Sequence, residues 1–307
     1  MATTINSHRL WPISVLIVLC YAHAASAAGD PPDLTYRTRA NEVRLTFSAS
    51  DQNNHGVATL QAGDFAVVDK DLIVRKFQSF TRSDSTKLEI AILVDASGSV
   101  APRFAPEISE LLDLLSQTAG IPEQNLSVFS FRDLQPKLVC SGNCRQSHPA
   151  ELVSAPHRGN LTPLYDSIVF ASDFLAQRAD RDVQKILIVF SDGQDSVSRH
   201  SLQDATDAAM KAAAQIYAID LNRNPSSQGS AVLYRFADAS GGRYFSGSNA
   251  PSRAMNVILE DFKASYIVTY RLPNYDSGFH ALRVLPTHNS NLQFRSRSGY
   301  FFSDENQ

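Results

Sequence analysis

The 307-residue sequence lacks the features that mark two large classes of protein. It has no run of basic residues and a formal net charge of −3, whereas nucleic-acid-binding chains usually carry a basic patch. The apolar stretch over residues 13–22 is too short to cross a bilayer. We therefore expect neither nucleic-acid binding nor a membrane span in the mature chain.

Motifs of several enzyme classes are also missing. The sequence contains no Gly-x-Ser-x-Gly elbow of a serine hydrolase and no Gly-x-Gly-x-x-Gly turn of a dinucleotide-binding enzyme. A haloacid-dehalogenase-type phosphatase would need a second carboxylate two residues after Asp95, and Ser97 stands there. We expect a protein that is not an enzyme. A magnesium-dependent hydrolase or phosphatase of a Rossmann-like fold is the alternative.

Small-x-small patterns at residues 22–24 and 25–27 follow the apolar stretch, as they do before a signal-peptidase site. They predict a secretory signal peptide over residues 1–28, cleaved after Ala27 or Ala28. An uncleaved N-terminal anchor is the alternative. We expect an exported bacterial protein, either periplasmic or secreted.

Cysteine is scarce, since the chain has three in all and only two beyond the predicted signal peptide. Those two, Cys140 and Cys144, are close enough in sequence to close a small loop in an oxidising compartment. A disulfide is the favoured interpretation. Free thiols are the next alternative, and a zinc site that includes His148 and His157 is the last.

The pattern of apolar residues changes twice along the chain. Before residue 87 it predicts strands over residues 41–50, 64–69 and 72–80, with no helix between them. From residue 88 strands alternate with helices, which predicts βαβ units and a mainly parallel sheet. The strands are expected over residues 88–94, 126–131, 186–190 and 216–219, and the helices over residues 104–118, 163–176, 201–214, 231–239 and 253–263.

The strand pattern returns after residue 264, with candidates over residues 266–271, 282–285 and 292–294. Neither group of terminal strands is large enough to be stable alone. The predicted fold is α/β, with a doubly wound sheet in a domain over residues 87–263. We expect this domain to be inserted into one small β-sandwich-like module built from residues 33–86 and 264–303.

Three of the expected loops between strands and helices carry oxygen side chains. Asp95, Ser97 and Ser99 follow the first buried strand, Thr162 directly precedes the proline that opens a helix, and Asp192 ends an apolar strand as Asp95 does. The carboxyl ends of parallel strands meet at one edge of a sheet. A carboxylate and two hydroxyls with room for water suit Mg²⁺. Asp195 is expected to be a solvated loop residue or a helix N-cap, and Asp166 to lie in a first helical turn.

These residues resemble the metal-ion-dependent adhesion site of von Willebrand factor type A (VWA) domains. In that family such residues hold one Mg²⁺ or Mn²⁺, partly through water, and a glutamate or aspartate of a partner protein completes the coordination shell. The resemblance implies a protein ligand with an exposed Asp or Glu carboxylate, and an exported adhesion-type module. The implied metal ligands are Asp95, Ser97, Ser99, Thr162 and Asp192.

Other stretches are similar to a VWA-related group common in acidobacteria. They are residues 56–80, 164–166, 191–196, 241–245 and 298–300. In integrin-type relatives the last helix shifts on ligand binding, and residues 253–263 are the equivalent here. A structural domain with a vestigial metal site is the remaining alternative.

Overall fold

The computed structural model describes residues 42–83, 87–97, 112, 121–144, 161–178, 183–222, 226–246 and 250–303. The strands are β1 (Glu42–Ser50), β2 (Phe65–Asp69), β3 (Leu72–Val74), β4 (Ser79–Arg82), β5 (Leu88–Asp95), β6 (Leu126–Arg132), β7 (Gln135–Ser141), β8 (Gln184–Ser191), β9 (Ala214–Asp220), β10 (Arg243–Phe245), β11 (Ser265–Arg271), β12 (Gly278–Pro286), β13 (Gln293–Ser296) and β14 (Gly299–Phe302). The helices are η4 (Glu123–Asn125), α3 (Leu164–Gln177), α4 (Leu202–Lys211), α5 (Gln228–Ser240) and α6 (Ala250–Lys263).

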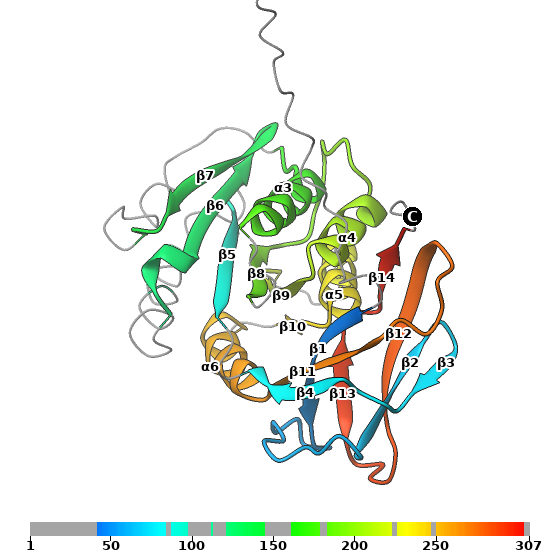
Figure 1. Ribbon diagram of the computed structural model, residues 1–307. Coiled ribbons are helices and arrows are strands. Elements are labelled where there is room, and N and C mark those ends of the chain that lie inside the picture. Colours follow the sequence, from blue (N-terminus) through cyan, green and yellow to red (C-terminus); the bar gives the residue numbers. More distant parts are fainter. Residues whose placement is uncertain are drawn as a thin grey trace, which may run out of the picture. The chain divides into compact units, whose positions relative to one another are not determined.

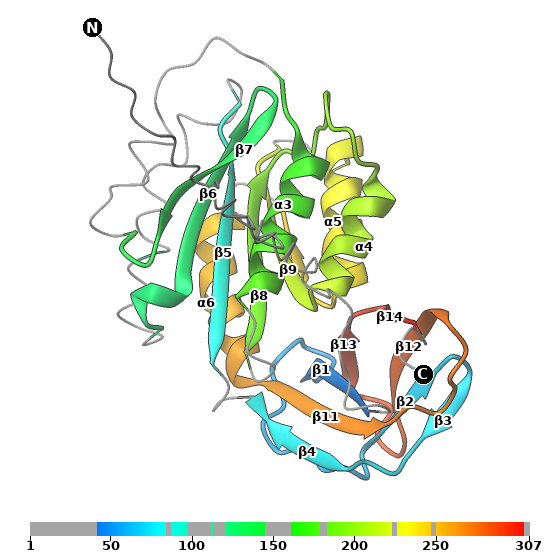
Figure 2. The same ribbon diagram turned by 45° about the horizontal axis from the view of Figure 1, so that its top comes forward.

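The central sheet has six strands in the order β10-β9-β8-β5-β6-β7, and only β7 runs antiparallel to its neighbour. Helices cover both faces: α3, α4 and α5 lie on one side and α6 on the other (Figure 2). Ile90 and Ile92 of β5 pack towards α6, whereas Ala91 and Leu93 pack towards the other three helices. The continuous apolar run of β5 is explained by this burial on both faces.

The strands at the two ends of the chain pair with one another. β1 lies between β11 and β13, all antiparallel, and β12 lies between β2 and β14 (Figure 1). Two four-stranded sheets result, β13-β1-β11-β4 and β14-β12-β2-β3, and side chains such as Phe47, Phe65 and Tyr266 fill one shared core. The predicted fold class, a doubly wound sheet joined to a small antiparallel module, is confirmed.

Several element predictions need correction. The single strand expected over residues 72–80 is two strands, β3 and β4, which belong to different sheets. β7, β10 and β14 were not predicted from the sequence. β7 contains Pro136 and is largely exposed, so it lacks the apolar alternation that identifies a half-buried strand. The helix expected over residues 201–214 ends at Lys211, because Ala213 has a positive φ and Ala214 begins β9.

Some predicted segments lie outside the described residues. They are the signal peptide and most of the helix expected over residues 104–118, of which only Leu112 is described, as a buried helical residue. None of the helices in the described part of the chain is long and apolar enough to cross a membrane.

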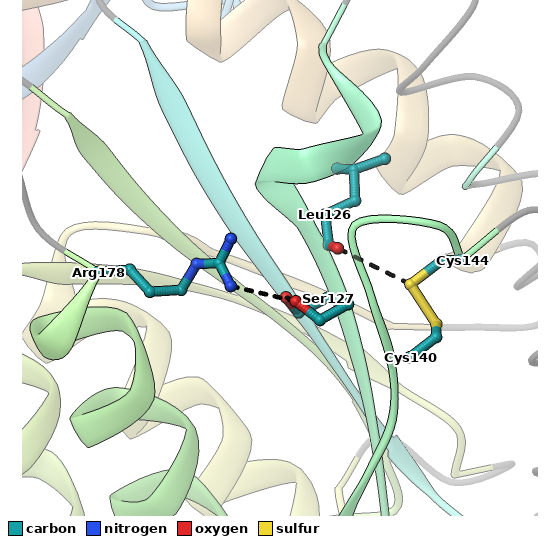
Figure 3. Close-up of a disulfide and its surroundings, with 6 residues drawn as sticks. Leu126, Ser127, Cys140, Cys144 and Arg178 are labelled. Atoms are coloured by element: carbon teal, nitrogen blue, oxygen red, sulfur yellow. Dashed lines mark hydrogen bonds between the residues drawn. A yellow bond between two sulfur atoms is a disulfide. The ribbon is translucent and has the colours of Figure 1, made fainter.

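Cys140 and Cys144 form a disulfide at the end of β7 (Figure 3), so the favoured interpretation of the two cysteines is confirmed. Both are buried, and Cys144 Sγ lies 3.7 Å from the carbonyl oxygen of Leu126. Arg178, just beyond α3, donates to Ser141 Oγ at 3.1 Å and pairs with the carboxylate of Glu89. Arg178 thus links β7 to β5, and the disulfide closes a short loop at the end of β7.

Candidate metal site

Asp95 ends β5 and is fully buried. Its Oδ1 accepts a hydrogen bond from the backbone N–H of Ser97 at 3.0 Å, and its Oδ2 accepts one from Ser191 Oγ at 2.8 Å. Ser191 ends the adjacent strand β8, and its hydroxyl in turn accepts the N–H of Gly193 at 3.0 Å. The carboxylate of Asp95 is therefore held between the loop that follows β5 and the loop that follows β8.

The electrostatic surroundings disfavour negative charge on both candidate aspartates. Burial, helped by the nearby negative charge of Asp192, raises the pKa of Asp95 to about 6. Hydrogen bonds from Ser97 and Ser191 act in the opposite direction, because they favour the charged form. Burial also raises the pKa of Asp192, and the charge of Asp220 acts in the same direction. A cation between Asp95 and Asp192 would reverse this penalty, because a nearby positive charge favours the ionised carboxylate.

Thr162 is buried and lies two residues before α3. Its N–H donates to Ser196 Oγ at 2.8 Å, and its carbonyl accepts the N–H of Ser196 at 2.9 Å. Ser196 belongs to the loop that also carries Asp192. The structure thus joins the second and third predicted loops directly.

Asp192 occupies a turn that requires glycine at the next position. Gly193 has φ +75°, and a Cβ there would lie 2.1 Å from the carbonyl oxygen of Gly229 at the start of α5. Asp192 Oδ1 accepts the N–H of Gln194 at 3.0 Å, and its carbonyl accepts from Asn222 Nδ2 at 2.6 Å. The backbone on both sides of this aspartate is therefore fixed by close contacts.

Of the five predicted ligands, Asp95, Ser97, Thr162 and Asp192 are described and Ser99 is not. Contacts link Asp95 to the end of β8 and Thr162 to the loop after it. Nowhere in the described residues do three or more His, Cys, Asp or Glu side chains gather as a metal cluster. A cation here would need hydroxyl and water oxygens beside its two carboxylates, a donor set that suits Mg²⁺.

The sequence analysis missed two polar residues at this edge, Ser191 and Asp220. Asp220 ends β9 and is buried. Its oxygens accept hydrogen bonds from Asn222 N and Nδ2, Ser230 Oγ and Tyr244 OH. With its lone pairs occupied by these donors, Asp220 stabilises the loops next to the site. Its signal was present in the sequence, because it follows an apolar strand as Asp95 and Asp192 do.

Comparison with known families matches residues 90–194 to the von Willebrand factor type A domain. These residues belong to a VWA domain. The match begins in β5 and ends just after Asp192, so all five predicted ligands lie within the matched part of this domain. No curated protein matches the chain significantly.

Solved structures that resemble the chain do so at low sequence identity. An aerotolerance-related membrane protein from Bacteroides fragilis NCTC 9343, solved with multiple mutations to serines, is 16% identical, with a TM-score of 0.42 over 57% of this chain and 99% of that chain. Proximal thread matrix protein 1 from the mussel byssus is 17% identical, with a TM-score of 0.46 over 63% of this chain and 50% of that chain. The N-terminal domain of TFIIH p34 is 11% identical, with a TM-score of 0.42 over 58% and 99%.

Proposed function

We propose that the VWA domain is a protein-binding module that presents Mg²⁺ or Mn²⁺ to an acidic side chain of a partner. The residues that would hold the ion are Asp95, Ser97, Ser99, Thr162 and Asp192. The observation that carries the proposal is the position of two carboxylates at the ends of the adjacent parallel strands β5 and β8: Asp95 is fully buried and Asp192 half-buried. Burial and neighbouring negative charge raise the pKa of both. A divalent cation is the counter-charge that such an arrangement needs.

The donor set favours an acidic partner over further water. Two aspartates balance the charge of a divalent ion, and the remaining protein ligands are neutral hydroxyls, so the ion keeps its attraction for a third carboxylate. Bound there, the metal would supply the direct contact to the partner's carboxylate. Ser191 and the backbone contacts around Asp192 would hold the ligands in place.

A binding module is favoured over a phosphatase because Ser97 replaces the second carboxylate that the phosphatase chemistry requires. We propose further that the protein acts outside the cytoplasm. The disulfide between Cys140 and Cys144 supports this proposal, because such bonds persist in oxidising compartments.

Isothermal titration of Mg²⁺ and Mn²⁺ into the protein tests the metal site. We expect saturable one-to-one binding that is lost in the double variant Asp95→Asn, Ser97→Ala. The matched control is Asp238→Ala, which removes an exposed carboxylate of α5 and should leave binding unchanged. Wild-type protein that binds neither ion, or a double variant that binds as the wild type does, would overturn the proposal.

The partner carboxylate can be tested with acetate as a minimal ligand. Paramagnetic Mn²⁺ in the site should relax the methyl protons of acetate more strongly than an equal concentration of free Mn²⁺ does. The double variant Asp95→Asn, Ser97→Ala is the control for Mn²⁺ bound elsewhere on the protein. If the methyl protons of acetate relax no faster than with free Mn²⁺, the metal site does not accept a carboxylate, and the proposed partner chemistry is wrong.

A further inference from the structure

Helix α3 begins without a capping side chain of its own. Its N-cap is Pro163, which makes no side-chain capping bond. The first-turn N–H groups of Tyr165 and Asp166 instead donate to Asp195 Oδ1 at 3.2 Å and to Ser198 Oγ at 3.0 Å. Exposed N–H groups at a helix start need such acceptors. Here the loop between β8 and α4 supplies them.

The first turn of α3 in turn supplies a hydrogen-bond acceptor to the backbone of this loop. Asp166, in the first turn of α3, accepts the backbone N–H groups of Arg199 at 3.0 Å and His200 at 2.9 Å, and its Oδ1 lies 2.8 Å from His200 Nδ1. Burial acts to raise the pKa of Asp166, yet these hydrogen bonds hold it below its usual value. Each segment thus contributes a carboxylate to the backbone of the other.

Two serines complete the connection. Ser196 exchanges two hydrogen bonds with the backbone of Thr162. Ser198 Oγ donates to Asp195 Oδ1 at 2.5 Å while it accepts from Asp166 N. We call Asp166, Asp195, Ser196 and Ser198 the loop clamp.

The loop clamp joins the segments that carry two of the candidate metal ligands. Thr162 lies four residues before Asp166, and Asp192 lies three residues before Asp195. We infer that the loop clamp sets the positions of Thr162 and Asp192 before metal arrives, and that Asp195 is a positioning residue that determines metal affinity. This inference rests on the proposed function. A ligand shell ordered in advance binds more tightly because binding need not order it.

Titration of Mg²⁺ into Asp195→Ala tests the inference. Loss of a residue that orients metal ligands typically weakens binding by about 10- to 100-fold, and we expect an increase in Kd of that size. Asp204→Ala is the matched control. Asp204 belongs to the capping box that starts α4, so its loss weakens a nearby helix start without touching the loop clamp.

Hydrogen exchange separates positioning from general destabilisation. In Asp195→Ala the N–H groups of Thr162, Tyr165 and Asp166 should exchange faster, while those of β5 and β8 stay protected as in the wild type. Ser198→Ala, which removes the acceptor for Asp166 N and the hydroxyl that donates to Asp195 Oδ1, is a second variant and should raise Kd in the same direction.

The outcomes distinguish the inference from the proposed function. If the wild-type protein binds no metal, the proposed function itself is wrong. If the wild-type protein binds metal and both Asp195→Ala and Ser198→Ala bind it with unchanged Kd, the positioning role of the loop clamp is wrong. The proposed metal site is then unaffected. An equal loss in Asp204→Ala and Asp195→Ala also overturns the positioning role, because the effect would then follow stability alone.

Discussion

Asp69 and Asp95 are both fully buried, but they lie in different parts of the fold. Asp69 in the β module is fully buried and accepts from Tyr270 and Tyr300, both at 2.8 Å, while His280 Nδ1 lies 3.2 Å away. Asp95 is equally buried, and its carboxylate accepts hydrogen bonds from one backbone N–H and from the hydroxyls of two serines. Asp69 belongs to the core of the β module, whereas Asp95 lies at the edge of the central sheet where we propose the metal site.

Lys185 is a second residue whose charge the fold disfavours. It is half-buried on β8, its Nζ donates to the carbonyl of Ala212 at 3.0 Å, and burial lowers its pKa to about 8. The unfolded chain keeps its proton up to the ordinary pKa of 10.5. Between these pH values the unfolded state binds more protons, so this residue makes the free energy of unfolding rise with pH.

Lys185→Met should remove that rise and increase the free energy of unfolding at pH 7 by about 1 kcal/mol, since a buried charge is replaced by an apolar chain of similar length. Urea denaturation at pH 7 and at pH 9.5 measures both effects. Lys137→Met, at an exposed position on β7, is the control. If the free energy of unfolding depends equally on pH in the wild type and in Lys185→Met, Lys185 is not the cause of the rise.

At the scale of elements, the starts of three helices organise the edge of the sheet that carries the candidate site. α4 has its own capping box of Ser201 and Asp204, and α5 is capped by Ser227, whose Oγ accepts from Ser230 N. α3 depends on the loop that precedes α4. The caps of α4 and α5 are local, whereas the side chains that accept from the first turn of α3 lie about 30 positions away.

The start of α5 also contacts the turn at Asp192. A Cβ on Gly229 would lie 2.1 Å from the carbonyl oxygen of Asp192. Gly229→Ala should therefore displace this turn, lower the free energy of unfolding by about 1–3 kcal/mol, as overpacking does, and weaken Mg²⁺ binding. Thermal denaturation and calorimetric titration measure the two effects.

Gly63→Ala is the matched control for this substitution, because a Cβ at Gly63 meets no atom within 4 Å. We expect it to leave stability and metal binding close to wild-type values. If Gly229→Ala behaves as Gly63→Ala does, the close approach between α5 and the Asp192 turn does not constrain the site.

For the whole molecule, the β module makes the two ends of the chain depend on each other. β11 has both of its neighbours, β1 and β4, in the N-terminal part of the chain, and β12 has β2 on one side. Asp261 of α6 adds a polar link, because it accepts from Arg243 at 2.8 Å and from Arg295 of β13 at 2.7 Å. Asp261 thereby ties α6 and β10 of the central sheet to β13 of the β module.

A chain that lacks residues 33–86 should fail to form the β module. Without β1, β2 and β4, the strands β11 and β12 lose most of their backbone partners and the core around Phe47 and Phe65. We expect the N–H groups of β11–β14 to exchange rapidly, while those of β5 and β8 stay protected. The control is the chain without residues 1–28. Slow exchange in β11 of the shortened chain would show that the C-terminal strands fold alone.

The sequence by itself determined the elements whose signals are local. Continuous apolar runs predicted β5 and β8, because strands covered on both faces exclude polar side chains, and the helical period predicted α3, α5 and α6. The order of strands and helices predicted the doubly wound sheet. The positions after the strands placed Asp95 and Asp192 at one edge.

Only the tertiary structure decided which distant segments meet. The strand pairs of the β module, the split of residues 72–80 and the exposed strand β7 depend on partners rather than on local pattern. The hydroxyl of Ser191 on Asp95 and the bond from Tyr165 to Asp195 join residues 96 and 30 positions apart. Such contacts follow from packing of the whole chain, because a single hydrogen-bonding side chain carries no periodic signal of its own.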